Sequence, residues 1–152
     1  MSAILEVRDV HHWFGQRKVL DGIHFKVGEG ETLVIMGGSG CGKSTLLRIL
    51  IGLLQPSKGE VLLFGEDMAR ASDAQKNNLR KKFGMLFQGA ALFNSLTVAE
   101  NIALPIREHT KLGLDIIQMI GQVKLELVGL SGFGDYKPYE ISGGMKKRVG
   151  LA

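Results

Sequence analysis

The chain has 152 residues and a formal net charge of +4, which comes from 19 Lys and Arg residues against 15 Asp and Glu residues. Its length suits one ordinary domain, and its 45% of apolar and 22% of charged residues are typical of a globular protein. No apolar run reaches the roughly 18 residues of a membrane-spanning helix, and the N-terminal stretch MSAILEVRDV lacks the features of a signal peptide. We therefore expect a cytoplasmic protein that does not cross the bilayer by itself.

The single cysteine, Cys41, cannot form an internal disulfide, which agrees with a reducing compartment. The mild positive charge would suit a nucleotide, a nucleic acid or an anionic membrane surface equally well, so it selects none of them. The 21 glycines are about twice the usual share and have no collagen-like period. Glycine is therefore expected where the backbone turns sharply or comes close to another group.

The beginning of the chain reads as strands separated by turns. The pattern predicts strands at residues 4–10, 18–27 and 31–36, with turn residues at Asp21-Gly22 and at residues 28–30. The run ETLVIM, residues 31–36, is short and apolar, as a buried parallel strand would be.

Helical patterns alternate with strands after this point. STLLRILIGLL, residues 44–54, predicts a core helix, and GEVLLFGED, residues 59–67, predicts a strand that ends in a turn. A capping-box pattern formed by Ser72 and Gln75 precedes a polar surface helix, and FGMLF, residues 83–87, returns as a strand.

The second half of the chain is helical in pattern. Thr97 and Glu100 form another capping box, and Pro105 is expected to end or bend the helix that follows. A longer helix is predicted from about residue 114 to residue 128, with an apolar stripe at helical spacing: Ile116, Ile120, Val123 and Leu127.

The stretch GGSGCGKST, residues 37–45, matches the pattern G-x-x-x-x-G-K-(S/T) of a phosphate-binding loop. Glycines let main-chain N–H groups turn toward an anion, and the following helix adds the positive end of its dipole. Lys43 would reach the β and γ phosphates, Ser44 would ligate Mg²⁺, and Thr45 would lie by the α phosphate. The competing interpretation is a plain glycine turn. The predicted binding residues for ATP and Mg²⁺ are Gly37, Gly38, Ser39, Gly40, Cys41, Gly42, Lys43, Ser44 and Thr45.

Cys41 lies inside this loop and has two interpretations. It is a small residue at a variable position, or its thiol lies so close to the bound phosphates that alkylation blocks nucleotide binding.

The chain closes with ISGGMKKRVGLA, residues 141–152. Ser142 at a helix N-cap, followed by Gly143 and Gly144, exposes unpaired N–H groups that can hold an anion. Three cations, Lys146, Lys147 and Arg148, lie in the early turns, where the helix dipole disfavours positive charge. An attracted phosphate is one explanation, and a capped helix with a solvated basic face is the other.

Together these motifs resemble the ATP-binding subunits of ABC transporters. Phe14-Gly15 precedes the phosphate loop, Gln88 follows the run GMLF, and ISGGM comes later, in the family's order and spacing. The resemblance covers the whole chain and implies an α/β P-loop NTPase fold with an antiparallel β subdomain. The implied divisions are a core with that subdomain at residues 1–88, a helical subdomain at 89–141, and a signature helix at 142–152.

The resemblance also implies residue roles. Phe14 would stack on adenine, and Gln88 would touch Mg²⁺ and the attacking water. Without the resemblance, Trp13 and Phe14 could be core aromatics and Gln88 a surface amide. In this family the signature residues of one subunit, here Ser142, Gly143 and Gly144, close over ATP held by a second subunit. A head-to-tail homodimer is therefore implied. The resemblance also implies a transmembrane permease subunit as partner and a location on the cytoplasmic face of the inner membrane.

Met145 stands where the family usually has Gln. SGGM and the stretch LFQGAALFNSLTVAENI resemble the subgroup that powers Mla-type phospholipid transporters and plastid lipid importers, whose partners include MCE-domain and lipid-binding subunits. A lipid substrate is therefore expected, with amino acid, peptide or metal importers as alternatives. Further alternatives are a soluble ABC protein acting on DNA or ribosomes, a small-molecule kinase or GTPase, and a nucleotide-dependent switch. We expect no nucleic-acid partner.

An ATPase of this class needs an apolar strand that ends in Asp-Glu after the signature, and a later His. The similar stretch VLLFGED, residues 61–67, precedes Gln88, and the four histidines all lie before the signature. The chain therefore reads as truncated, with an exposed apolar sheet edge and poor solubility. Residues 1–152 alone are expected to bind ATP weakly and to be inactive in hydrolysis.

Overall fold

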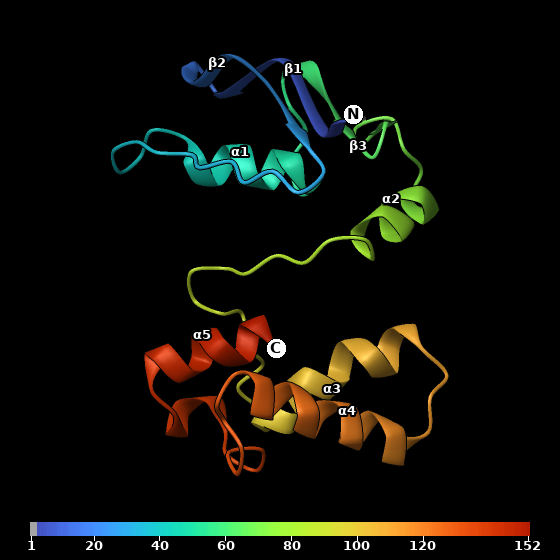
Figure 1. Cartoon of the computed structure of the whole chain (residues 1–152). Coiled ribbons are helices and arrows are strands. Elements are labelled where there is room, and N and C mark those ends of the chain that lie inside the picture. Colours follow the sequence, from blue (N-terminus) through green and yellow to red (C-terminus); the bar gives the residue numbers. More distant parts are fainter. Residues whose placement is uncertain (1–2) are drawn as a thin grey trace. The chain divides into compact units, whose positions relative to one another are not determined.

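The computed structural model describes residues 3–152. The chain forms two compact units, one that ends at Gly84 and one that spans Met85–Ala152 (Figure 1). Each unit is described by itself. Residues 1 and 2, which begin the stretch considered above for a signal peptide, lie outside the described residues.

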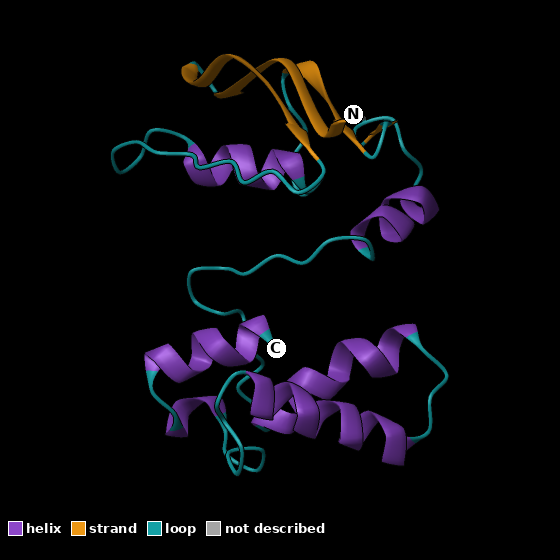
Figure 2. Cartoon of the chain, viewed as in Figure 1, coloured by secondary structure: helices purple, strands orange, loops and turns teal. Residues whose placement is uncertain are grey.

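The first unit is built on a four-stranded antiparallel sheet of order β2-β1-β3-β4 (Figure 2). A tight turn at residues 15–16 joins the two long strands, and a second turn at 64–65 joins the two short ones. The strand bounds are β1, Ala3–Phe14; β2, Arg17–Gly28; β3, Lys58–Leu63; and β4, Glu66–Asp67. The predicted antiparallel β subdomain is therefore present.

Helix α1, Lys43–Leu50, covers one face of this sheet. It is shorter than the predicted helix of residues 44–54, because Gly52 with φ of 70° reverses the chain just after it. Only one side of α1 is buried. The shared core consists of Val7, Val10, Leu20, Leu46, Ile49, Leu50 and Val61.

An irregularity in β1 decides which of its side chains face this core. Asp9 has a φ of 46°, and the register with β2 shifts between Val7 and Val10. The extra residue resets the two-residue alternation of the strand. Consequently Val7, Val10 and His12 are all buried.

The two capping boxes predicted from sequence are both confirmed. Ser72 and Gln75 bond reciprocally at the start of α2, Asp73–Arg80, in the first unit. Thr97 and Glu100 do the same at the start of α3, Val98–His109, in the second unit. Each box satisfies backbone N–H groups that the first helical turn leaves unpaired.

The second unit is a small helical domain. Beside α3 it contains α4, Leu114–Leu127, a short 3-10 turn η1, Pro138–Glu140, and α5, Gly143–Leu151. Its core consists of Val98, Ile102, Leu125, Leu130, Ile141 and Val149. Pro105 does not end α3, which continues through it to His109.

The strands predicted at residues 31–36 and 83–87 are wrong. Both segments are irregular, and within residues 3–152 neither pairs with any strand. A parallel strand forms only when neighbouring strands satisfy its N–H and C=O groups, so an apolar pattern alone does not create it. Instead of a sheet edge, residues 31–36 form an exposed apolar segment in which Val34 is 68% and Met36 85% exposed.

One smaller prediction is also corrected, and the structure shows which side of α4 is buried. Asp21-Gly22 is not a turn but lies inside β2, where Gly22 has a φ of 65°. The apolar stripe of α4 faces outward, with Val123 51% and Leu127 75% exposed. The buried side of this helix is instead formed by Ile117, Gly121 and Leu125.

None of the helices in the described part of the chain is long and apolar enough to cross a membrane.

Candidate nucleotide-binding site

The glycine-rich loop leads directly into the N-terminus of α1. Gly42 is the N-cap residue, with φ of 101°, and no side chain bonds to the free N–H groups of the first turn. Only glycine adopts this backbone conformation without strain. The loop therefore presents unpaired main-chain donors and the positive end of a helix dipole, which together favour an anion.

Close packing against β2 holds this end of the loop in place. A Cβ atom on Gly42 would lie 2.9 Å from Leu20 Cδ2 and 2.9 Å from the carbonyl oxygen of Val19. No larger residue fits here without displacement of the strand. Gly42 of the loop thus packs directly on Val19 and Leu20 of the sheet.

Lys43 folds back over the loop that precedes it. Its Nζ donates hydrogen bonds of 2.7 Å to the carbonyl oxygens of both Gly37 and Gly38. The ammonium group is thus held over the main chain of the loop. From there it can exchange these carbonyl partners for phosphate oxygens. The adjacent Ser44 is exposed and Thr45 is half-buried, so both hydroxyl groups are close to the surface.

Cys41 is exposed, and its Sγ lies 3.7 Å from Lys43 Nζ. The thiol also fills the space in which a side chain on Gly37 would lie. A reagent bonded to this sulfur would occupy the surroundings of the ammonium group.

Phe14 ends β1 next to the turn at residues 15–16, and 53% of its surface is exposed. The neighbouring ring of Trp13 is already covered, by stacking on His11 and by the ammonium of Lys18 at 5.6 Å. Of these two aromatic rings, Phe14 is therefore the one with a free surface for a ligand.

Gln88 is exposed in a turn of the second unit. The N–H of Ala90 donates to the carbonyl oxygen of Phe87 at 2.9 Å and closes this turn. Ala90 also packs against Gly150 of α5, since a Cβ atom on Gly150 would lie 3.1 Å from the Ala90 oxygen. The turn of Gln88 and the helix α5 are thus in direct contact.

The N-terminus of α5 has one half of a capping box and not the other. Ser142 Oγ accepts a hydrogen bond of 3.2 Å from the N–H of Met145. Helices α2 and α3 have Gln or Glu at the corresponding position, which bonds back to the cap, but the side chain of Met145 cannot accept in this way. With Gly143 and Gly144 exposed, this terminus keeps free donors for an anion.

Two polar residues that the sequence analysis gave no such role organise the second unit. Arg148 donates to the carbonyl oxygens of Val128 at 2.9 Å and Gly129 at 3.2 Å, at the C-terminal end of α4. Asn101 accepts from the N–H of Phe93 at 2.7 Å and shapes the loop before α3. Neither contact leaves a local sequence signal, because the partners are not neighbours on one helix face.

The predicted residues fall into two groups. Phe14 and residues 37–45 share the first unit, and Gln88 and residues 142–144 share the second. Within residues 3–152, no cluster of three or more His, Cys, Asp or Glu side chains is placed to hold a metal ion.

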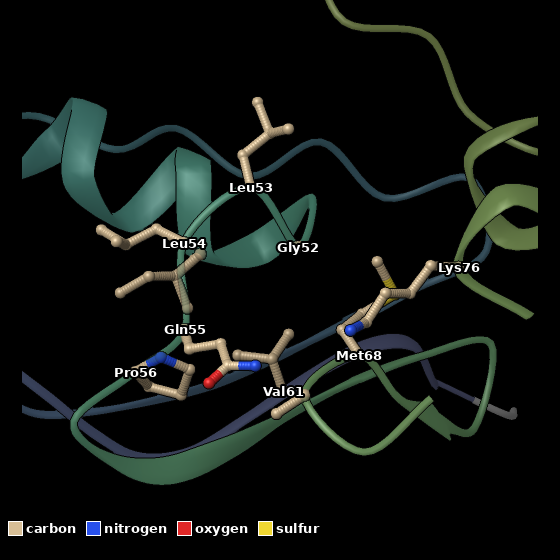
Figure 3. Close-up of a pocket in the computed structure, with 10 residues that line it drawn as sticks. Gly52, Leu53, Leu54, Gln55, Pro56, Val61, Met68 and Lys76 are labelled. Carbon is tan, nitrogen blue, oxygen red and sulfur yellow. The ribbon is translucent and has the colours of Figure 1, made fainter. Parts of the chain in front are cut away.

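A separate pocket of 240 Å³ lies at the other end of α1 (Figure 3). Gln55, Val61, Met68 and Lys76 are among its lining residues. Because it adjoins the C-terminal end of the helix, where the dipole is negative, it is unsuited to phosphate.

A glycine-rich loop with an inward lysine, leading into a helix that packs on a β-sheet, defines a P-loop nucleotide-binding protein. A family model described as ABC transporter matches residues 20–152. The chain belongs to this family and has the fold of its ATP-binding cassettes.

Curated relatives agree with this assignment. The intermembrane phospholipid transport system ATP-binding protein MlaF of Haemophilus influenzae is 43% identical over 98% of this chain and 56% of its own length. The chloroplastic protein TRIGALACTOSYLDIACYLGLYCEROL 3 of Arabidopsis thaliana is 45% identical over 99% of this chain and 44% of its own length. The chain thus spans about half the length of these relatives.

Solved structures confirm the fold class. The dimeric, post-hydrolysis ATP-binding cassette MJ0796 bound to ADP and Pi aligns with a TM-score of 0.88 and 29% identity, over 97% of this chain and 67% of the other. The cbiO1 protein of Clostridium perfringens, part of the transporter complex cbiONQ, aligns with a TM-score of 0.82 and 29% identity, over 99% of this chain and 60% of the other.

Proposed function

We propose that this chain binds Mg-ATP at residues 37–45 and serves as the ATP-binding subunit of a transporter that moves phospholipid across or between membranes. The observation that carries the proposal is the geometry of the loop: the ammonium of Lys43 lies over the carbonyl groups of Gly37 and Gly38 beside the uncapped N-terminus of α1. The ammonium of Lys43 and the N-terminus of α1 both attract negative charge, and a triphosphate supplies it.

The role of each loop residue follows from its position. Lys43 exchanges its carbonyl partners for β and γ phosphate oxygens, and Thr45 lies by the α phosphate. The exposed hydroxyl of Ser44 and the amide of Gln88 suit the hard cation Mg²⁺, which prefers oxygen ligands and takes the rest from phosphate and water. When bound, Mg²⁺ neutralises phosphate charge, and Phe14 stacks on the adenine.

Residues 142–144 complete the site of a second copy of the chain. The first turn of α5 has N–H groups suited to an anion, and only the N–H of Met145 is capped by Ser142. The dimeric state of the related cassette MJ0796 supports a head-to-tail homodimer. The proposed parts of this domain are the core with its β subdomain at residues 1–88, the helical subdomain at 89–141 and the signature helix at 142–152.

The phospholipid substrate rests on the similarity to MlaF, which is named for intermembrane phospholipid transport. The partner is a transmembrane permease on the cytoplasmic face of the inner membrane, with MCE-domain and lipid-binding subunits in the same assembly. The exposed apolar side of α4 supports a protein partner on the second unit.

Hydrolysis requires a carboxylate that polarises the attacking water, and no carboxylate follows the signature within these residues. Residues 1–152 by themselves should therefore bind ATP weakly and release phosphate negligibly. Steady phosphate release by this chain that Lys43→Ala abolishes would contradict the expectation.

Titration calorimetry of the intact protein with Mg-ATP tests the central proposal. Lys43→Ala should weaken binding at least about tenfold, because a charge-assisted contact is lost. Lys18→Ala, which removes a cation outside the loop, is the matched control and should bind normally. Equal affinity of the Lys43→Ala variant and the unmodified protein would refute the proposed site.

A further inference from the structure

His12 occupies a core position that an apolar residue would fill at less cost. It is 6% exposed, and its Nε2 atom has no hydrogen-bond partner within residues 3–152. Buried polar groups without a partner are rare in folded proteins, and each one needs an explanation. The explanation here lies in the neighbours of the ring.

Ser57 fixes the imidazole from one side. Its Oγ accepts from the N–H of Trp13 at 3.2 Å and lies 3.4 Å from His12 Nδ1. Ser57 Oγ thus links His12 Nδ1 to the main chain of Trp13. This contact restricts the orientation of the ring.

Phe14 also packs against this imidazole. The two ring centroids are 4.7 Å apart with an interplanar angle of 80°, so the edge of one ring meets the face of the other. Such pairs are attractive beyond the area they bury. Phe14 is nevertheless 53% exposed, so His12 holds the ring and leaves much of it open.

The pair lies next to the phosphate loop. His12 pairs with Leu20 across the β1–β2 ladder. The side chain of Leu20 in turn lies against Gly42, at the start of α1. A continuous series of neighbours thus runs from the aromatic pair through Leu20 to Gly42.

We infer that His12 is a positioning residue that fixes the Phe14 ring for stacking on the adenine base of the nucleotide. This inference rests on the proposed ATP site and adds to it the means by which an exposed aromatic ring is pre-oriented. Without His12 the ring would sample several rotamers, and base stacking would have to restrict it.

The test compares Mg-ATP with magnesium tripolyphosphate, which has the phosphates but no base, in binding titrations of the intact protein. His12→Leu should weaken ATP binding about three- to tenfold, the range of an aromatic pair contribution, and leave tripolyphosphate binding unchanged. His12→Phe restores a ring and should return ATP affinity to within about twofold. His24→Leu, the same change on an exposed residue of β2, is the control.

The outcomes separate the two proposals. If Phe14→Ala weakens ATP selectively but His12→Leu does not, the role of His12 is refuted while base stacking stands. If Phe14→Ala has no selective effect, stacking and the role of His12 both fail. Equal weakening of both ligands by His12→Leu also refutes the inference, since it indicates a purely structural residue. If His12→Leu does not fold, as reported by the fluorescence of Trp13, Ser57→Ala decides the question and should weaken ATP selectively.

Discussion

The guanidinium group of Arg148 lies 2.9 Å from the carbonyl oxygen of Val128 and donates a hydrogen bond to it. This contact joins α5 to the C-terminal end of α4, where carbonyl groups have no partner within the helix. A cation at this end also meets the negative pole of the α4 dipole. Of the three cations after the signature, Arg148 therefore has a structural role, and Lys146 and Lys147 are the two that could meet a ligand.

Replacement of Arg148 by Met should lower the free energy of unfolding of the second unit by about 1 kcal/mol, the value of a charge-assisted hydrogen bond reduced for exposure. Urea unfolding measures the change. Lys147→Met, which removes an exposed neighbouring charge, is the matched control and should have little effect. Equal losses in the two variants would show that the contact with α4 contributes nothing.

The junction of the loop with β2 gives a second prediction. Gly42→Ala introduces a Cβ atom 2.9 Å from the Val19 oxygen at a φ of 101°, so it should destabilise the first unit by about 1–3 kcal/mol. Gly38→Ala places its Cβ in open space and is the control. Urea midpoints of both variants should differ clearly. A Gly42→Ala variant as stable as Gly38→Ala would contradict the packing described here.

Cys41 is the single cysteine of the chain and is exposed, so a maleimide should label it at one site. Because its Sγ lies 3.7 Å from Lys43 Nζ, Mg-ATP bound at that ammonium should slow the labelling. Mass spectrometry over a time course measures the rate, and Lys43→Ala should abolish the protection. A labelling rate that saturating ATP leaves unchanged would disprove the proximity of thiol and phosphates.

A surface ion network gives a prediction of pH dependence. Arg8 Nη2 and Lys26 Nζ lie 2.7 Å and 2.6 Å from the carboxylate of Glu6. The hydrogen bond from Arg8, followed by that from Lys26, lowers the pKa of Glu6 from 4.5 to about 2. The unfolded chain therefore takes up this proton at a higher pH than the folded chain, and the stabilisation is present above about pH 4.5 and is lost as the pH falls toward 2.

Glu6→Gln should accordingly be less stable than the unmodified protein at neutral pH, and the difference should vanish toward pH 2. Thermal unfolding at a series of pH values measures it. Glu29→Gln, in the exposed turn after β2, is the control. A difference between Glu6→Gln and the unmodified protein that stays constant across this range would contradict the ion network.

The features that were predictable from the sequence are those with local causes. The capping boxes at Ser72 and Thr97 depend on residues three positions apart, and both formed as expected. The loop at residues 37–45 follows from glycines and a lysine within nine positions. The helix expected after the loop is present as α1, whereas the strand expected before it is not.

The errors and omissions concern distant partners. Residues 31–36 have the composition of a buried strand, but a strand also needs a neighbour, and composition does not supply one. Likewise the role of His12 depends on Ser57, 45 positions away, and that of Arg148 on Val128, 20 positions away. The helical spacing predicted for α4 was correct, but the spacing of one stripe does not say which side of a helix a neighbour covers; the buried side contains Ile117, Gly121 and Leu125.

Ala90 and Ala91, just after Gln88, both have left-handed backbone conformations, with φ of 63° and 53°. Such a conformation costs an L-residue about 1–2 kcal/mol, so the two together load the turn with roughly 2–4 kcal/mol. Ala90 lies against Gly150 of α5, where an added Cβ atom would come within 3.1 Å of the Ala90 oxygen. A larger residue at position 150 would therefore disturb the backbone two positions after Gln88.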